Sequence, residues 1–436
     1  MRPVKLAMTF VLAAAVGVGL NGAAREPAAT AVQTLAVGGR ANANVSLASE
    51  GKTVVATWSA ALPDGTTDLF AAVSRDGGAA FGAPVRVNQT PGAVRVNGEQ
   101  PPRVTLVPRG TAVPAIVVIW TARAASGTVL LTARSEDGGR TFGPSTLVPG
   151  TDAAGNRGWE AIGTDPAGGV HAAWLDHRRM AAPDATKTAA THRHGEGSSA
   201  GDGVAMAQLS DLYFDTLTDA AAPKAVTPGV CYCCKTAVAF GKPKQLFLAW
   251  RHVYPGNFRD MAFAASSDGG RTFGSPVRVS QDNWMLEGCP DDGPALKVDG
   301  RGRIHIAWPA VVAEKGTQGT QTKALFYAMS SDGRAFQPRV RIPTEGQANH
   351  PQLALASDGT LQLAWDEAGG GTRRIVTGSG VVDATGHATF TRTPLAGETG
   401  VYPVIVATPG GALVAWTSGA PDSSVIRARP MEHARR

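Results

Sequence analysis

Four cysteines form the most distinctive chemical group in this chain of 436 residues. Cys231, Cys233 and Cys234 stand close together, and the fourth is Cys289. An even number of cysteines is typical of disulfide bonds in an exported protein, and a bridge from Cys233 or Cys234 to Cys289 is easier than a strained ring between adjacent cysteines. Grouped thiolates also bind soft metal ions, although Cys-x-Cys-Cys is not a zinc-ribbon spacing. The sequence leaves both interpretations open.

Histidines could complete such a metal site. His177 and His252 follow shortly after tryptophans, whereas His192 and His194 lie in a polar, glycine-rich loop that also reads as a plain surface insertion. Imidazole nitrogen and thiolate sulfur together suit copper or zinc. The candidate metal ligands are therefore Cys231, Cys233, Cys234, Cys289, His177, His192, His194 and His252.

A repeated octet gives the first indication of the fold that must position these residues. The pattern Ser-x-Asp-Gly-Gly-x-x-Phe occurs at 74–81, 135–142 and 266–273, with a shortened copy at 330–336 and a decayed one around Asp383. The Asp side chain can accept backbone N–H bonds, the glycines allow positive φ, and the Phe anchors the loop in apolar packing. Each octet therefore predicts a tight turn between two strands.

Tryptophans give the period of the repeat. Seven of the nine end short apolar runs: Trp58, Trp120, Trp174, Trp250, Trp308, Trp365 and Trp416. An apolar run precedes each of these strands, and a third strand, the octet and a short fourth strand follow in the regular units. Four antiparallel strands per unit predict an all-β fold, a β-propeller of seven blades, with six as the alternative. The last unit lacks a fourth strand, which the segment 34–37 could supply.

Bulk properties limit the possible partners. Gly and Pro are frequent, only 17% of residues are charged, and the net charge of +6 is spread along the chain. We therefore expect no nucleic acid or membrane partner. Arg2 and Lys5 precede an apolar stretch at 6–20 that is too short to favour a membrane span, and small residues follow it. We predict a signal peptide at 1–24, a leader at 25–33, a single propeller domain at 34–430, a tail at 431–436, and a periplasmic or secreted protein.

The octets resemble the Asp-boxes, or BNR repeats, of the sialidase (neuraminidase) superfamily, whose members are β-propellers. The resemblance covers nearly the whole mature chain, and in that family the boxes are structural turns on the outer rim. It implies an exo-α-sialidase-type glycoside hydrolase acting on acidic sugars. The family's Arg-Ile-Pro motif precedes its first box, whereas the only such string here, 341–343, follows the fourth. For the tyrosine nucleophile, carboxylates and arginine that the family uses, the candidates are Tyr402, Glu160, Asp176 and Arg251.

Alternating strand direction sorts the remaining polar residues by face. Segments that enter the first strand of a blade, and loops that follow a repeat tryptophan, lie on the same face of a propeller. We call it the cysteine face, because 231–234 enters blade four there. Asp366 is a further carboxylate of this face, and the candidate ligand-binding residues are Trp159, Arg178, Arg259, Trp284, Asp291 and Asp292.

Three classes of function fit these residues. The first is a sialidase-type glycosidase, the second a metalloprotein with copper or zinc at the Cys/His group, and the third a non-catalytic binding or scaffold propeller. The expected partner is a small molecule, a glycan or a metal ion. The sequence favours a sialidase-like propeller with a specialised ligand or soft-metal site on the cysteine face.

Overall fold

The computed structural model describes residues 31–181, 200–219, 221–286, 290–313 and 321–432. The predicted signal peptide and the candidates Cys289, His192 and His194 lie outside the described residues. Among the described residues, no helix is long and apolar enough to cross a membrane.

The described strands form seven four-stranded antiparallel sheets, which confirms the predicted seven-bladed propeller. The first three blades, in order from the inner strand outward, are β2 (Ala41–Glu50), β3 (Thr53–Ala61), β4 (Thr67–Ser74) and β5 (Val85–Arg86); β6 (Arg103–Arg109), β7 (Ala112–Ala124), β8 (Gly127–Ser135) and β9 (Thr146–Leu147); and β10 (Arg157–Thr164), β11 (Val170–Asp176), β12 (Asp211–Thr216) and β13 (Lys224–Pro228). A short helix, α2 (Ala200–Gln208), lies between β11 and β12 in the chain.

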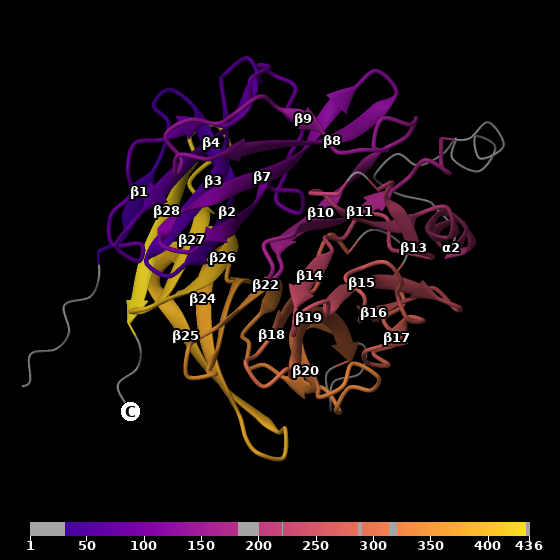
Figure 1. Cartoon of the computed structure of the whole chain (residues 1–436). Coiled ribbons are helices and arrows are strands. Elements are labelled where there is room, and N and C mark those ends of the chain that lie inside the picture. The colour runs from indigo at the N-terminus through magenta and orange to yellow at the C-terminus, as the bar shows by residue number, and fades with distance from the viewer. Residues whose placement is uncertain (1–30, 182–199, 220, 287–289, 314–320, 433–436) are drawn as a thin grey trace, which may run out of the picture. The chain divides into compact units, whose positions relative to one another are not determined.

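Blades four to six repeat this order. They are β14 (Ala237–Phe240), β15 (Leu246–Tyr254), β16 (Phe258–Ser266) and β17 (Val277–Arg278); β18 (Ala295–Val298), β19 (Ile304–Ala313), β20 (Gln321–Ser330) and β21 (Val340–Arg341); and β22 (Gln347–Leu355), β23 (Leu361–Gly369), β24 (Thr372–Val382) and β25 (Ala388–Thr399). Figure 1 shows the blades following one another from the indigo β2 to the yellow β27.

Blade seven joins the two ends of the propeller. It combines β26 (Val401–Thr408), β27 (Gly411–Ser418) and β28 (Val425–Glu432) with β1 (Gln33–Leu35), which pairs antiparallel with β28 through Thr34 and Arg427. The segment expected to close the ring does so. Inner strands of neighbouring blades contact one another all the way round, including β2 with β26. The strands of the ring thus run from Gln33 at the start of β1 to Glu432 at the end of β28.

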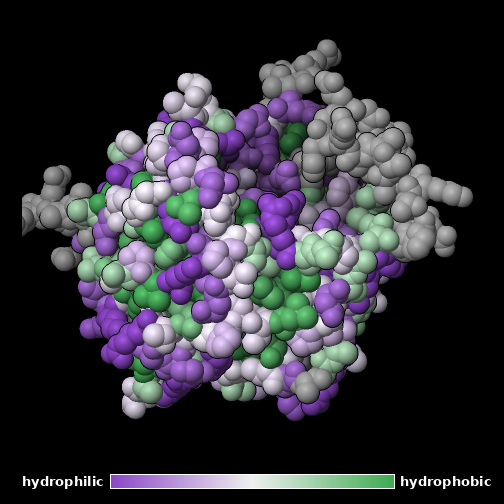
Figure 2. Space-filling view, turned by 90° about the horizontal axis from the view of Figure 1, so that it is seen from above, coloured by the Kyte–Doolittle hydropathy of each residue, from purple (hydrophilic) through white to green (hydrophobic). Residues whose placement is uncertain are grey.

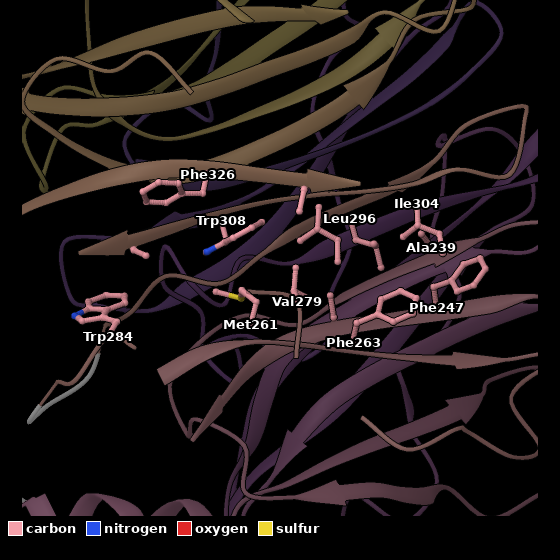
Figure 3. Packing of buried hydrophobic residues seen from close by; sticks show 14 of the residues in the cluster. Ala239, Phe247, Met261, Phe263, Val279, Trp284, Leu296, Ile304, Trp308 and Phe326 are labelled. Atoms are coloured by element: carbon pink, nitrogen blue, oxygen red, sulfur yellow. The ribbon is translucent and has the colours of Figure 1, made fainter. Parts of the chain in front are cut away.

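The repeat tryptophans form the structural centre of each blade. All seven are fully buried, and they anchor clusters of alternating strand residues between neighbouring blades. Figure 3 shows one such cluster, where Trp308 and Phe326 of blade five pack towards Met261 and Phe263 of blade four. Burial of this apolar surface stabilises each blade against the next.

The turns formed by the repeated octets have the hydrogen bonds expected of them. In the first, Ser74 Oγ donates to Asp76 Oδ1 (2.6 Å) and accepts from the Gly78 N–H (2.8 Å), while Asp76 also accepts the Ala80 N–H (3.0 Å). The same contacts recur in the boxes of Asp137 and Asp268. These acidic side chains are therefore satisfied locally, which agrees with a structural role on the rim.

Candidate functional site

A channel runs between the inner strands of the seven blades. Two adjoining cavities of about 160 and 600 Å³ lie along it and share the lining residues Val104, Ile162 and Lys297. The smaller cavity reaches Arg103 and Lys235, whereas the larger one reaches Glu50 and Asp165, which belong to the opposite end. The mouth near Lys235 is the one on the cysteine face.

In four of the seven blades, a bulge near the start of the inner strand redirects one side chain in this region. In blades one, three, six and seven the pairing shifts there, and a non-glycine residue with positive φ occupies the bulge. These residues are Asn44 (φ 61°), Trp159 (55°), His350 (55°) and Tyr402 (52°). Bulges often redirect side chains next to functional sites, and positive φ is costly for such residues unless the surroundings enforce it. Lys235 has the corresponding position in blade four, two residues before Ala237.

His350 and Tyr402 meet at the mouth, and Asp366 fixes the imidazole. The rings of His350 and Tyr402 lie 3.9 Å apart, centroid to centroid. His350 Nδ1 lies 2.5 Å from Asp366 Oδ1, and Arg373 donates to the other carboxylate oxygen at 2.5 Å. A carboxylate on Nδ1 fixes the tautomer and ring orientation, which leaves Nε2 as the nitrogen for proton transfer.

Glu99 enters the same site from the segment before blade two. Asn97 Oδ1 accepts the backbone N–H groups of Glu99 and Gln100, which fixes this turn. A Cβ added to Gly98 would lie 2.1 Å from ring atoms of Tyr402, so only glycine allows the ring this close to the turn. Glu99 Oε2 accepts the Lys235 N–H at 3.3 Å.

Lys235 stands between two buried carboxylates. Its Nζ is 3.9 Å from both Glu99 Oε1 and Asp292 Oδ1, and neither of these buried oxygens has a hydrogen-bond partner among the described residues. The other oxygen of Asp292 accepts the His350 N–H (2.9 Å) and pairs with Lys323 Nζ (3.1 Å). The site therefore holds two carboxylate oxygens that a ligand hydroxyl could satisfy.

The acidic groups at this mouth differ in how their surroundings shift their pKa values. Burial raises the pKa of Glu99, although Lys235 opposes this effect. Asp292 is also buried, but Lys323, His350 and Lys235 lower its pKa to about 2, so it stays ionised. Burial, and then the charges of Glu99, Asp292 and Asp366, raise the pKa of Tyr402, so its phenol is protonated at neutral pH. A base with a raised pKa beside a protonated phenol suits proton transfer.

The two cations that pair with the buried carboxylates of this mouth are partly accessible. The side chains of Asp292 and Asp366 are fully buried, whereas those of Lys323 and Arg373 are 15% and 34% exposed. A ligand arriving from solvent therefore meets Lys323 and Arg373 before Asp292 and Asp366, and it also meets the exposed Asp291, whose charge acts on Tyr402. Figure 2 shows one face of the molecule, on which hydrophilic and hydrophobic residues are interspersed.

Two predicted catalytic carboxylates have structural partners. Asp176 is fully buried, pairs with Arg157 and Arg178, and accepts the Trp174 indole N–H at 3.3 Å. Arg178, expected to bind ligand, therefore serves this buried cluster and the Gly150 carbonyl. Glu160 is buried between blades two and three, where it accepts from Thr121 Oγ1 at 3.2 Å, and burial raises its pKa to about 7.

Arg251, which we expected to contact an acidic substrate, instead binds backbone carbonyl groups. Its guanidinium is buried and donates to the backbone carbonyls of Asp292, Arg259 and Pro309. Trp284 packs against this guanidinium, 4.7 Å from ring centroid to Cζ. These two residues therefore hold the segments that carry Asp292 and Arg259. Asp291 is exposed with a positive φ of 44°.

The three described cysteines lie close together, whereas the fourth of the predicted group, Cys289, lies outside the described residues. Their Sγ atoms are 3.8 to 3.9 Å apart, Cys231 and Cys234 are free thiols, and Cys233 is in a disulfide. Arg259 Nη1 donates to Cys231 Sγ at 3.2 Å. The hydrogen bond from Cys234, with the charges of Arg259 and Arg251, lowers the pKa of Cys231 to about 6 despite burial, which raises the pKa of Cys234.

Neither described histidine candidate joins this sulfur group, which holds only cysteines among the residues that the structure describes. His177 packs on Trp159, with ring centroids 5.4 Å apart, and His252 accepts the Trp250 indole N–H at Nδ1 (3.3 Å). Burial lowers the pKa of each to about 4, so both are neutral at pH 7. Both histidines therefore serve in structural contacts with tryptophans.

Several residues at the mouth were missed from the sequence: His350, Glu99, Lys323 and Arg373. One signal was available for His350. It stands 15 residues before a repeat tryptophan, as Trp159 and Lys235 do, and Tyr402 stands 14 before its own. Glu99 has no such signal, since it reaches the mouth from a loop ahead of blade two.

Comparisons with known proteins give likeness of structure only. No protein-family model and no curated protein matches the sequence. An α-L-arabinofuranosidase from Fusarium graminearum is 11% identical, with 92% of this chain and 98% of that chain covered and a TM-score of 0.48. A polysaccharide lyase, an ulvan lyase, is 10% identical (89% and 93% covered, TM-score 0.49), and a microbial sialidase 14% identical (84% and 73%, TM-score 0.45). Likeness at this level assigns no activity.

Proposed function

We propose that the protein is an exported glycosidase that cleaves an acidic sugar at the cysteine-face mouth of the channel. The observation that carries the proposal is the contact of Tyr402 with His350 and its Asp366 partner, beside Glu99. Export rests on the signal peptide predicted at 1–24 from the sequence.

The proposed chemistry gives each group one role. Tyr402 attacks the anomeric carbon, and Glu99 accepts its phenolic proton. His350 donates a proton from Nε2 to the departing glycosidic oxygen, while Asp366 stabilises the imidazolium. Water then releases the sugar from Tyr402 as the same groups return the protons. Asp292 remains ionised and stabilises the positive charge that develops on the sugar ring.

The accessible cations define the substrate class. Lys323 and Arg373 are partly accessible cations beside the buried carboxylates, so they would pair with the carboxylate of a sialic or uronic acid. A neutral sugar of the same size offers them no partner. We therefore expect acidic oligosaccharides to bind and neutral ones not to.

Calorimetric titration with matched acidic and neutral oligosaccharides tests this proposal. Lys323→Gln should weaken binding of the acidic members by about tenfold or more, because a charged hydrogen bond contributes about 1.5–3 kcal/mol. The matched control is Lys244→Gln, an exposed residue in the turn between β14 and β15, which should leave binding unchanged. Equal binding of neutral and acidic sugars, or an unchanged affinity in Lys323→Gln, would contradict it.

A further inference from the structure

We propose that the channel interior is a binding site for a tetrahedral oxyanion, sulfate or phosphate, held between Arg103 and Lys297. The site lies in the smaller cavity, which begins at Lys235 near the cysteine-face mouth and extends inward to Lys297. It is independent of the proposed glycan cleavage. A free ion and an ester group on a larger molecule present the same oxygens, so the proposal names this shared chemistry.

Among the described residues that line this cavity, every charged side chain is positive. They are Arg103, Lys235 and Lys297. The acidic lining residues Glu50 and Asp165 belong to the larger cavity, at the opposite end of the channel. A cleft with charges of one sign and low-dielectric walls concentrates ions of the opposite sign. The smaller cavity therefore attracts anions.

The strand register places Arg103 and Lys297 on opposite walls of the channel. Arg103 pairs with Ile119, the residue before a repeat tryptophan. In blade five, Ala295 pairs with Ala307, which also directly precedes its tryptophan. Lys297 stands two residues later, so it lies about 7 Å farther along the channel. Because blades two and five are three steps apart in a ring of seven, the two cations approach from opposite sides.

Small side chains leave room between the two cations. At the equivalent positions of other blades stand Ala161, Ala237 and Ala295 in the layer of Arg103, and Ala48, Gly163, Ala239 and Ala354 in the layer of Lys297. The cavity measures about 160 Å³, and a water molecule needs about 10–15 Å³ of such space. An oxyanion of five heavy atoms therefore fits together with several waters.

The protein offsets the charge of these two cations only in part. Burial lowers the pKa of Lys297, and no carboxylate among the described residues acts against this effect. Burial also lowers the pKa of Arg103, whose Nε donates to the Glu160 carbonyl at 3.1 Å. Glu160 and Glu99 act on Arg103, but burial raises the pKa of both acids. A bound oxyanion would supply the counter-charge that buried cations need.

Cations on opposite walls select a tetrahedral anion. Sulfate and phosphate direct oxygens to both sides at once, so one ion can accept from the planar guanidinium of Arg103 and from the ammonium of Lys297. A carboxylate directs both oxygens to one side, and chloride carries a single charge. We therefore expect sulfate and phosphate to bind more tightly than acetate or chloride.

Calorimetric titration of the full-length protein with sodium sulfate, phosphate, acetate and chloride at low ionic strength tests the site. We expect one sulfate per chain, and at least about tenfold weaker binding of acetate and chloride. Lys297→Gln and Arg103→Gln should each weaken sulfate binding by about tenfold or more, because each removes a charged hydrogen bond. The control Lys244→Gln, in the exposed turn between β14 and β15, should leave it unchanged.

Two outcomes of this titration would overturn the proposal. One is acetate or chloride binding as tightly as sulfate. The other is sulfate binding that is lost in Lys323→Gln but kept in Lys297→Gln, which would place the anion at the mouth and would leave the proposed glycan site standing. Glucose 6-sulfate identifies the source of the oxyanion: tighter binding than free sulfate, still dependent on Lys297, indicates an ester group, and weaker binding indicates a free ion.

Anomalous diffraction from crystals soaked in selenate, a tetrahedral analogue of sulfate, needs no variant and decides the matter if Arg103→Gln fails to fold. We expect a selenium peak inside the channel between Arg103 and Lys297. A peak only at the mouth beside Lys323, or an empty channel at saturating selenate, would contradict the proposal.

Discussion

His350 and Tyr402 lie in contact because they occupy the same position in neighbouring blades. Each sits in the bulge of its inner strand with positive φ, at 55° and 52°, and their rings are 3.9 Å apart. The repeat thus brings together two aromatic side chains separated by more than fifty positions in sequence. The backbone strain at both places is consistent with a functional site enforced by its surroundings.

Gly98 is predicted to be essential for the placement of Tyr402. Its φ is not in the left-handed region, so alanine is allowed by the backbone, but the added Cβ would lie 2.1 Å from the Tyr402 ring. Gly98→Ala should lower kcat by about 100-fold, since a displacement of about 1 Å has effects of that order. The control Gly300→Ala adds a Cβ into open space and should change neither kcat nor stability. An unchanged kcat in Gly98→Ala would show that the ring position does not matter.

Glu160 is predicted to make stability fall as pH rises. Its pKa is raised from 4.5 to about 7 by burial, so the folded protein keeps the proton that the unfolded chain loses between these values. The contribution of Glu160 to the free energy of unfolding is therefore fully present below pH 4.5 and declines from there to pH 7. At pH 8 the free energy of unfolding is lower by about 3 kcal/mol.

Urea unfolding at pH 4.5 and pH 8 measures this effect. Glu160→Gln removes the charge and should stabilise the protein at pH 8 but not at pH 4.5. The exposed Glu50→Gln should behave like wild type at both values. A gain from Glu160→Gln that is the same at both pH values would contradict the prediction.

Asp176 is predicted to matter for stability and not for turnover. It is buried between Arg157 and Arg178, so Asp176→Asn leaves buried guanidinium charge unpaired and should cost about 3–5 kcal/mol of unfolding free energy. The value of kcat, measured below the unfolding transition, should stay the same. The exposed Asp422→Asn should change stability by less than about 0.5 kcal/mol. A large loss of kcat without a loss of stability would restore the catalytic role inferred from the sequence.

Closure of the ring by β1 is predicted to stabilise the whole propeller. Leu35 is 7% exposed and packs with the core between blades one and seven, so Leu35→Ala should lower the unfolding free energy by about 2–5 kcal/mol. Thr34→Ala, an exposed position in the same strand, is the matched control and should stay near wild type. Equal unfolding midpoints for both variants would show that the closing strand contributes little.

The propeller could be predicted because its signals are local and repeated. Each tryptophan and each box fixes a strand or a turn through neighbours in sequence, and seven copies define the ring. The closing segment 34–37 was found because blade seven lacked a strand. The number of blades and the closing strand were therefore confirmed by the strand pairing.

The site was less predictable because the repeat also uses polar residues for structure. Asp176, His252 and Glu367 each stand two residues after a repeat tryptophan and accept its indole N–H. The first two were taken for catalytic or metal-binding groups because they share a face with the cysteines. The strand pattern in the sequence predicts the face of the propeller on which a residue lies. It does not predict which residues meet across the channel, because that depends on bulges and on loops such as the one that carries Glu99.

The central claim is that Tyr402 cleaves acidic glycosides, and the release of sugar from a panel of acidic and neutral glycosides tests it most directly. Wild-type protein and Tyr213→Phe, which alters a tyrosine of the third strand of blade three, should release the acidic sugar at similar rates. Tyr402→Phe should lose at least about 100-fold in rate with its fold intact, because the nucleophilic oxygen is gone. Neutral glycosides should not be cleaved. Full activity in Tyr402→Phe, or no release of any acidic sugar by the wild type, would contradict the account.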